Sequence, residues 1–255
     1  MTQWIRFEHG GEKKFGTLEG DTIAVHEGDM FNQPKSTSES VALGDVNILT
    51  PTEPSKIVAL WNNFYALGQK LNLDTPPEPL YFIKASTSSL AGGEQIRRPA
   101  SFDGKVIFEG ELGIVIGKKC STVSEAEAGD YIFGYTCVND VTAVELLNKD
   151  ASFAQWTRAK SFDTFGVMGP VVATGLDPAT LAIVSVLNGD ERQNYPVSDM
   201  VFQPHRLVSL VSQDLTLLSG DVIACGTSVG VGSMKPGSTI NITIEGIGTI
   251  SNTFD

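Results

Sequence analysis

The chain has 255 residues and a formal net charge of −12, with 41% hydrophobic and 19% charged residues. This length and composition are typical of a soluble globular protein with a full hydrophobic core. The negative charge argues against nucleic acid and anionic membranes as partners, and no apolar run reaches the roughly 18 residues of a transmembrane helix.

Cysteine usage and the first residues indicate a cytoplasmic protein. Cys120, Cys137 and Cys225 lie far apart without CxxC spacing, so neither a disulfide framework nor a zinc site is expected. The N-terminus has no basic region followed by an apolar core, so we expect no secretory signal. The 26 glycines, with frequent Val, Ile and Thr, favour strands joined by tight turns.

Residues 1–50 are predicted to form a small N-terminal β domain. Short strands over 5–7, 15–18 and 22–25 are separated by turns rich in glycine and charged residues. The polar segment 33–40 is predicted to be a loop. Pro51 and Pro54 mark the boundary to a main domain over 54–255, because two prolines in four residues resist both a helix and a central strand.

The main domain is predicted to be predominantly β (α+β), with a few short helices. A helix beginning near residue 63 is expected to bury Phe64, Leu67 and Leu71. Thr142 and Glu145 fit a capping box that begins another helix. Strands are expected over 56–61, 80–84, 131–139, 171–174, 183–189, 221–225 and 239–244, a helix over 204–211, and irregular structure over 149–169.

Two carboxylates share one face of a strand predicted over 108–116. Side chains alternate along a strand, so Glu109 and Glu111 point to one side while large apolar residues cover the other. A divalent cation, which prefers oxygen ligands, would relieve their repulsion. Asp140 adds a third carboxylate at the end of another apolar strand. The alternatives are a solvated strand face for the glutamates and a helix cap for Asp140.

Two further segments are candidates for binding. Residues 156–166 combine polar and aromatic side chains without periodicity, as in a recognition loop or in an ordinary capped turn. Residues 226–232 form a glycine-rich segment after a strand, which suits either close approach to a ligand anion or a plain β-turn. The segment matches neither a Walker A loop nor GxGxxG.

Five motifs in a fixed order resemble the fumarylacetoacetate hydrolase family over about residues 54–255. They are Phe-Glu-x-Glu-Leu from 108, Phe-Gly-Tyr-Thr-x-x-Asn-Asp from 133, Lys-Ser-Phe-Asp-Thr-Phe-x-x-x-Gly-Pro from 160, Gly-Asp-Val-Ile-x-x-Gly-Thr from 220 and Glu-Gly-Ile-Gly-Thr-x-x-Asn from 245. The resemblance implies a β-roll catalytic domain of mixed sheets, usually a homodimer. It also implies one Mg²⁺ or Mn²⁺ held by Glu109, Glu111 and Asp140.

The same resemblance implies roles for residues outside the carboxylate trio. Lys160 matches the lysine of the Lys-Ser-Phe motif and is expected to be catalytic. Lys84 matches the lysine of a Phe-x-Lys motif, and Thr227 with Gly226 matches the glycine-rich loop, so these three are expected to bind substrate.

One element of the family pattern is altered. The family's Gly-x-Asn-Tyr-x-x-His-x-x-Glu has Leu67 at the His position and Lys70 at the Glu position, so the pair that activates water in hydrolytic members is missing. Tyr65 is a candidate proton donor, with helix packing as the alternative; its reference pKa of about 10 makes it a poor base. The later Ser/Thr-Ala-Arg-Asp-x-Gln pattern is altered over 142–147, and Ser228 replaces the usual proline after Gly-Thr. The chain's three histidines are expected at the surface.

The resemblance implies a divalent-metal-dependent enzyme acting on a 2-oxo acid or acylpyruvate-type 1,3-dioxo substrate through a metal-bound enolate. C–C hydrolysis, decarboxylation and keto–enol isomerisation are the possible outcomes. The missing pair favours the last two, which need no activated water. A catalytically silent member that binds a 2-oxo acid or scaffolds a partner is the alternative, against which the intact carboxylate trio argues.

Overall fold

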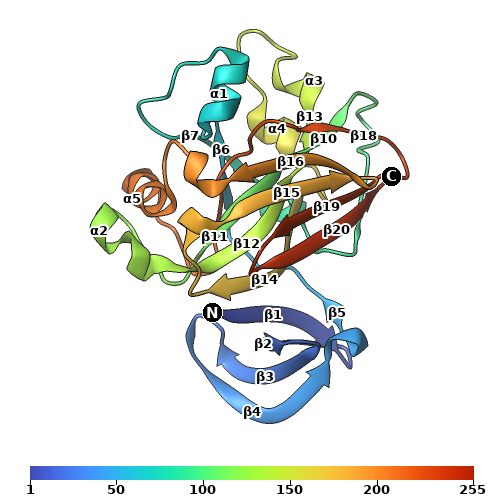
Figure 1. The fold of residues 1–255 in the computed structure, drawn as a ribbon, viewed down its shortest axis with the longest axis vertical. Helices are drawn as coiled ribbons and strands as arrows, with labels where there is room; N and C mark the ends of the chain where they lie inside the picture. The colour runs from blue at the N-terminus through green and yellow to red at the C-terminus, as the bar shows by residue number, and fades with distance from the viewer.

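The chain folds into three β-sheets with short helices around them, as a computed structural model of residues 1–255 shows (Figure 1). The predicted, predominantly β architecture of mixed sheets is confirmed. None of the helices is both long enough and apolar enough to cross a membrane.

The largest sheet has 12 strands and runs in the order β4-β3-β2-β1-β14-β12-β11-β17-β6-β7, with β5 paired to β1 and β8 to β14. Its strands are β1 (Thr2–His9), β2 (Glu12–Glu19), β3 (Thr22–Asp29), β4 (Asn32–Ala42), β5 (Asn47–Ile48), β6 (Ile57–Trp61), β7 (Leu80–Lys84), β8 (Ser89–Leu90), β11 (Gly110–Ile116), β12 (Ile132–Asp140), β14 (Gly166–Thr174) and β17 (Val222–Ala224). Most neighbours are antiparallel, whereas β17 with β6 and β14 with β8 are parallel.

Two smaller sheets complete the β structure. The three-stranded sheet β13-β10-β18 contains β10 (Val106–Phe108), β13 (Thr142–Ala143) and β18 (Gly232–Met234). The five-stranded sheet β16-β15-β19-β20-β9 contains β9 (Gln95–Ile96), β15 (Ala182–Leu187), β16 (Asp190–Pro196), β19 (Thr239–Ile244) and β20 (Gly248–Phe254). The strands predicted between residues 56 and 244 are present, but β8, β9, β13, β16, β18 and β20 were not predicted.

The helices are short. They are α1 (Tyr65–Leu71), α2 (Glu125–Ala128), α3 (Val144–Leu147), α4 (Trp156–Lys160) and α5 (Pro204–Asp214), with 3-10 turns η1 (Leu43–Asp45), η2 (Ser86–Ser88), η3 (Gly129–Tyr131), η4 (Pro178–Thr180) and η5 (Val197–Asp199). In Figure 1, α1, α3 and α4 lie at the end of the molecule opposite the N-terminal strands, and α2 and α5 lie together at one side.

The N-terminal strands form a separate layer in Figure 1, below β14. They are nevertheless part of the large sheet, because β1 pairs antiparallel with β14 and places Thr2 opposite Thr174. Ile5, Phe7 and Ile23 belong to the same buried cluster as the main core. A division of the chain at residues 51–53 stays a prediction.

The loop predicted over 33–40 is wrong, because these residues lie in β4. The strand pairs with β3 along one side only and ends the sheet. An edge strand facing solvent needs no apolar alternation, which is the signal that sequence analysis uses.

Three expectations about helices also need correction. Thr142 does not cap a helix: it lies in β13, and the structure gives α3 no side-chain cap. Residues 149–169 are not wholly irregular, since they contain α4 and the start of β14. Leu67 is buried in α1 as expected, but Leu71 is 45% exposed.

The hydrophobic core lies on both faces of the large sheet. A cluster of 49 buried residues fills the space between this sheet, the five-stranded sheet and α5. A second cluster of nine residues includes Val115, Val138 and Phe82 and covers the other face. Because both faces of β11 are buried, its one polar side chain, Glu111, lies in a largely water-excluded interior.

Candidate active site

The candidate site begins where the chain passes from one sheet to another. The strand predicted over 108–116 is interrupted at Glu109: β10 ends at Phe108 in the three-stranded sheet, and β11 begins at Gly110 in the large sheet. The amide of Asp140 donates to the carbonyl of Glu109 (2.9 Å), which keeps β12 beside the junction. Glu111 pairs with Val138, so its side chain projects on the same face as that of Asp140.

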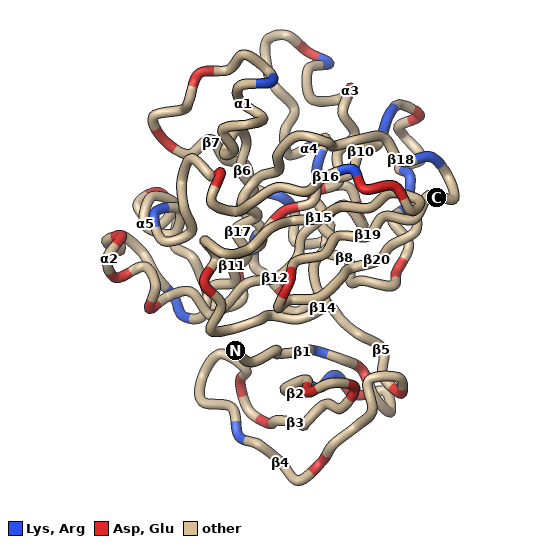
Figure 2. The backbone as a smooth tube through the Cα atoms, viewed as in Figure 1, with Lys and Arg blue, Asp and Glu red and all other residues tan.

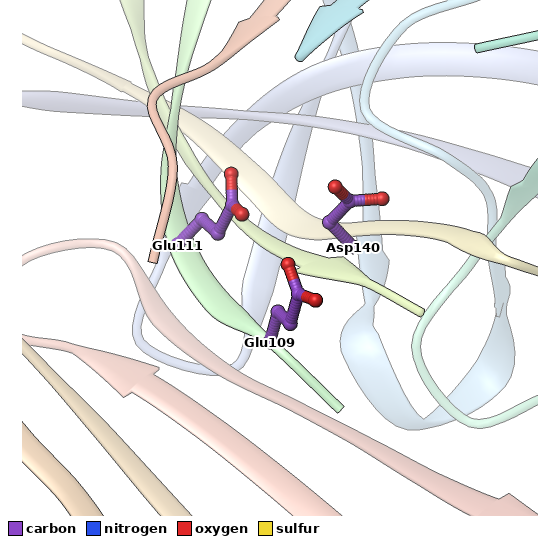
Figure 3. A group of neighbouring side chains, drawn as sticks. All are labelled: Glu109, Glu111 and Asp140. Carbon is purple, nitrogen blue, oxygen red and sulfur yellow. The ribbon is translucent and has the colours of Figure 1, made fainter. Parts of the chain in front are cut away.

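The structure brings the three predicted carboxylates together. One oxygen of each of Glu109, Glu111 and Asp140 lies within 4.8 Å of the others. Figure 3 shows the three side chains turned towards one shared space. Glu111 and Asp140 are fully buried, whereas the Glu109 side chain is 12% exposed. Solvent therefore reaches the group at Glu109.

Two buried lysines neutralise part of this charge. Lys160, at the end of α4, places its Nζ 2.7 Å from both Glu109 Oε2 and Asp140 Oδ2. Lys84, at the end of β7, donates to Asp140 Oδ1, to the carbonyl of Lys160 and to that of Phe165. Lys84 is completely buried, so all of its donors face protein groups.

The surroundings shift the pKa values of these groups in different directions. Burial, reinforced by Asp140 and Glu109, raises the pKa of Glu111 well above its usual value. Burial also opposes ionisation of Asp140, but Lys160 and Lys84 outweigh it and hold its pKa below the usual value. For Lys160 the carboxylates outweigh burial and raise its pKa, so it stays protonated.

The donor set fits a hard divalent cation. Glu111 Oε1 is buried and has no hydrogen-bond partner, which costs free energy unless a cation or a proton occupies the space beside it. Carboxylate oxygens are the ligands that Mg²⁺ and Mn²⁺ favour. Three carboxylates and two ammonium groups carry a formal charge of −1, and a divalent cation would make it +1. Such a site would suit an anionic substrate.

The glycine-rich loop contacts the carboxylate strand directly. The amide of Gly226 donates to Glu111 Oε2 (2.9 Å), and Thr227 Oγ1 donates to the carbonyl of Gly110 (2.9 Å). Gly226 has a φ of +89°, a conformation that glycine adopts without strain. Both donors predicted to contact substrate are thus already paired with protein, and their substrate-binding role stays a prediction.

The beginning of α1 is tied to this loop. The Asn63 side chain donates to the carbonyl of Cys225 (2.8 Å), next to Gly226. Tyr65 follows as the first residue of α1 and is 44% exposed, whereas Leu67 is 7% exposed and packs in the core. The proton-transfer role of Tyr65 stays a prediction.

Two polar residues that support Glu109 were missed as site residues. Thr142 Oγ1 donates to Glu109 Oε1 (2.9 Å), although the sequence suggested a helix cap. Asn139 Oδ1 accepts the Glu109 amide (3.0 Å). Asn139 stands beside Asp140 in the Asn-Asp motif, and this adjacency was the only available signal.

Acidic residues outnumber basic ones in this chain, 30 to 18. Figure 2 shows lysine and arginine scattered over the N-terminal strands and the main body without a continuous stripe. Lys84 and Lys160 are the buried lysines of the chain, and both form ion pairs with the carboxylates.

Comparisons with known proteins agree with this geometry. Residues 56–255 match the family described as fumarylacetoacetate (FAA) hydrolase C-terminal, and residues 2–51 match one described as Rv2993c-like, N-terminal. The oxaloacetate tautomerase YisK of Bacillus subtilis is 33% identical, over 92% of this chain and 83% of its own.

Two solved structures are also similar. The 2-hydroxyhepta-2,4-diene-1,7-dioate isomerase from Mycobacterium marinum is 38% identical, with a TM-score of 0.91 over 100% of this chain and 98% of that one. The maleylpyruvate hydrolase from Sphingobium sp. SYK-6, in complex with manganese (II) ion and pyruvate, is 26% identical, with a TM-score of 0.79 over 99% and 98%.

Proposed function

This chain belongs to the fumarylacetoacetate hydrolase family of enzymes, and on that premise we propose that it catalyses the keto–enol isomerisation of a small anionic 2-oxo acid with the help of Mg²⁺ or Mn²⁺. The observation that carries the proposal is a complete carboxylate–lysine centre beside an α1 helix that has Leu67 where hydrolytic members have histidine. Leu67 is buried and cannot accept a proton, and Lys70 is not a carboxylate. Isomerisation needs no activated water.

The names of similar proteins support the same reaction class. One relative is named an oxaloacetate tautomerase and a solved neighbour a heptadienedioate isomerase. The substrates in these two names are 2-oxo or 2-hydroxy dicarboxylates, which carry the negative charge that the site would accept.

The divalent cation would be held by Glu109, Glu111 and Asp140 and would supply Lewis acidity towards the keto and carboxylate oxygens of the substrate. Glu109 lies at the exposed side of the group, so substrate enters there. Asp140 stays ionised between two lysines, which keeps its position fixed.

Lys160 is the group placed to stabilise the enol oxygen. Its Nζ lies 2.7 Å from two of the carboxylates, and they keep it protonated, so it donates hydrogen bonds and does not act as a base. A fixed cation beside an oxygen that gains negative charge stabilises the transition state and so lowers the activation barrier. Lys84 contacts Asp140 and two carbonyls and would act through Asp140, as a positioning residue.

Tyr65 is our candidate for donating the proton to carbon 3. It lies two residues after Asn63, which binds Cys225, and Gly226 in turn binds Glu111. A phenol that can transfer its proton needs only a hydrogen-bonded approach to the substrate, which the half-exposed position of Tyr65 permits.

The test uses purified protein with Mn²⁺ and three substrates: oxaloacetate enol, a 2-hydroxydienedioate and an acylpyruvate. We expect the enol absorbance to fall much faster with enzyme than in buffer alone, and we expect neither CO₂ nor acid to be released. Glu111→Gln and chelation should each remove at least 90% of the rate, and Tyr65→Phe should lower kcat by roughly 10²-fold or more. Rapid acid release from the acylpyruvate would instead support hydrolysis, the reaction named for the Sphingobium neighbour. Metal binding without any turnover would support the silent binder.

A further inference from the structure

Gly110 lies between Glu109 and Glu111. It is the first residue of β11, where the chain leaves the three-stranded sheet and enters the large sheet. Its amide finds no strand partner and donates to the side chain of Gln193 (3.0 Å). Its carbonyl accepts from Thr227 Oγ1 (2.9 Å) and from the hydroxyl of Tyr195. The amide and the carbonyl of Gly110 are therefore both held by side chains, whereas the carbonyl of Glu109 accepts from the Asp140 amide of β12.

Gln193 is the centre of this arrangement. It comes from β16 in the five-stranded sheet, is 1% exposed, and makes its hydrogen bonds to groups other than the three carboxylates. Its Oε1 accepts from Gly110 and from Ser185 Oγ (2.9 Å), while its Nε2 donates to Thr227 Oγ1 (2.9 Å) and to the carbonyl of Ser228 (3.2 Å). The amide thus uses both its acceptor sites and both its donors.

The packing around Gly110 leaves no room for a larger residue. A Cβ on Gly110 would lie 2.2 Å from Ser185 Oγ and 3.1 Å from Gln193 Oε1. Only glycine lets the five-stranded sheet approach the ligand-bearing strand this closely. Gln193 and Tyr195 lie two residues apart on β16, so both side chains point from the same face.

We propose that Gln193, assisted by Tyr195, is a positioning residue of the cation site: it fixes the Gly110 peptide and so sets the separation of Glu109 and Glu111. This rests on the proposed function in one respect, that a divalent cation binds the three carboxylates. Groups that orient metal ligands without contacting the metal commonly change its affinity by about 10- to 100-fold when removed.

The test measures Mn²⁺ binding by calorimetry without substrate, together with thermal stability of the metal-free protein. Gln193→Met keeps the side-chain length and removes all hydrogen bonds of the Gln193 amide, including a long one (3.5 Å) to the carbonyl of Val229. Asn252→Leu is the matched control, because Asn252 is also a buried amide of the five-stranded sheet but binds only the carbonyls of Ala91 and Glu94. We expect both variants to lose stability, whereas only Gln193→Met weakens Mn²⁺ binding, by about 10- to 100-fold.

Tyr195→Phe removes one hydroxyl and keeps the ring, so it decides the question if Gln193→Met does not fold; we expect an increase of about threefold or more in the Mn²⁺ Kd. The proposal is overturned if folded Gln193→Met binds Mn²⁺ within about twofold of wild type, or if Asn252→Leu weakens binding equally. Glu111→Gln separates the two proposals. If it abolishes binding while wild type lacks isomerase activity, the function fails and the positioning role stands; if wild type binds no Mn²⁺ at all, both fail.

Discussion

Lys84→Met offers the sharpest test of how the buried charges stabilise the fold. The substitution removes the three hydrogen bonds that Lys84 donates to Asp140, to the Lys160 carbonyl and to the Phe165 carbonyl. Breaking a fully buried ion pair costs about 3–5 kcal/mol, because the remaining partner keeps its desolvation cost. In a protein of this size each kcal/mol lowers Tm by about 2–4 °C, so we expect a fall of about 6–20 °C.

The measurement is a calorimetric scan of the metal-free protein, with Lys13→Met as control. Lys13 pairs with Glu53 at 3.2 Å, but its side chain is 66% exposed, so its loss should cost at most about 1 kcal/mol. A Tm within about 3 °C of wild type would refute the buried ion pair as a major source of stability.

Three further outcomes are expected. Leu67→His combined with Lys70→Glu should raise acylpyruvate hydrolysis at least tenfold, measured as acid release, and no increase would contradict the assignment of these positions. Cys120, Cys137 and Cys225 are all buried, and burial raises the pKa of Cys137 to about 12. The native protein should therefore not react faster with a thiol reagent as pH rises from 7 to 9, whereas unfolded protein, with thiol pKa values of about 8.5, should. Light scattering should give a homodimer of twice 27.3 kDa; a monomer at micromolar concentration would contradict that expectation.

Whether the sequence could predict a contact in the site depended on how far apart the two residues lie along the chain. Glu109 and Glu111 are neighbours, and their shared face follows from strand geometry alone. The contact of Lys84 with Asp140 joins residues 56 positions apart, and no local pattern marks it. Sequence motifs placed both residues in the site, but only the fold shows that Lys84 faces protein oxygens on all sides.

The errors in the predicted fold have the same physical cause, which is a contact with a residue distant in the sequence. Thr142 and Glu145 match a capping box by spacing, but each side chain has a more distant partner: Glu109 Oε1 and the Lys105 amide. β16 has the sequence Asp-Glu-Arg-Gln-Asn-Tyr-Pro, which is too polar to predict a strand. Its Gln193 and Tyr195 are buried because the neighbouring sheet supplies polar partners, and a pattern of hydrophobicity cannot reveal that.

The polar strand β4 has a consequence for the protein at high concentration. As the last strand of the large sheet, it has one row of backbone groups without a strand partner, and such an edge can recruit a strand from another molecule. Pro34, Lys35 and Glu39 lie along it, and two register irregularities interrupt its pairing with β3. A missing donor, charged side chains and local twist all discourage the growth of intermolecular sheets. The segment that looked least structured in the sequence is thus an edge strand whose residues oppose aggregation.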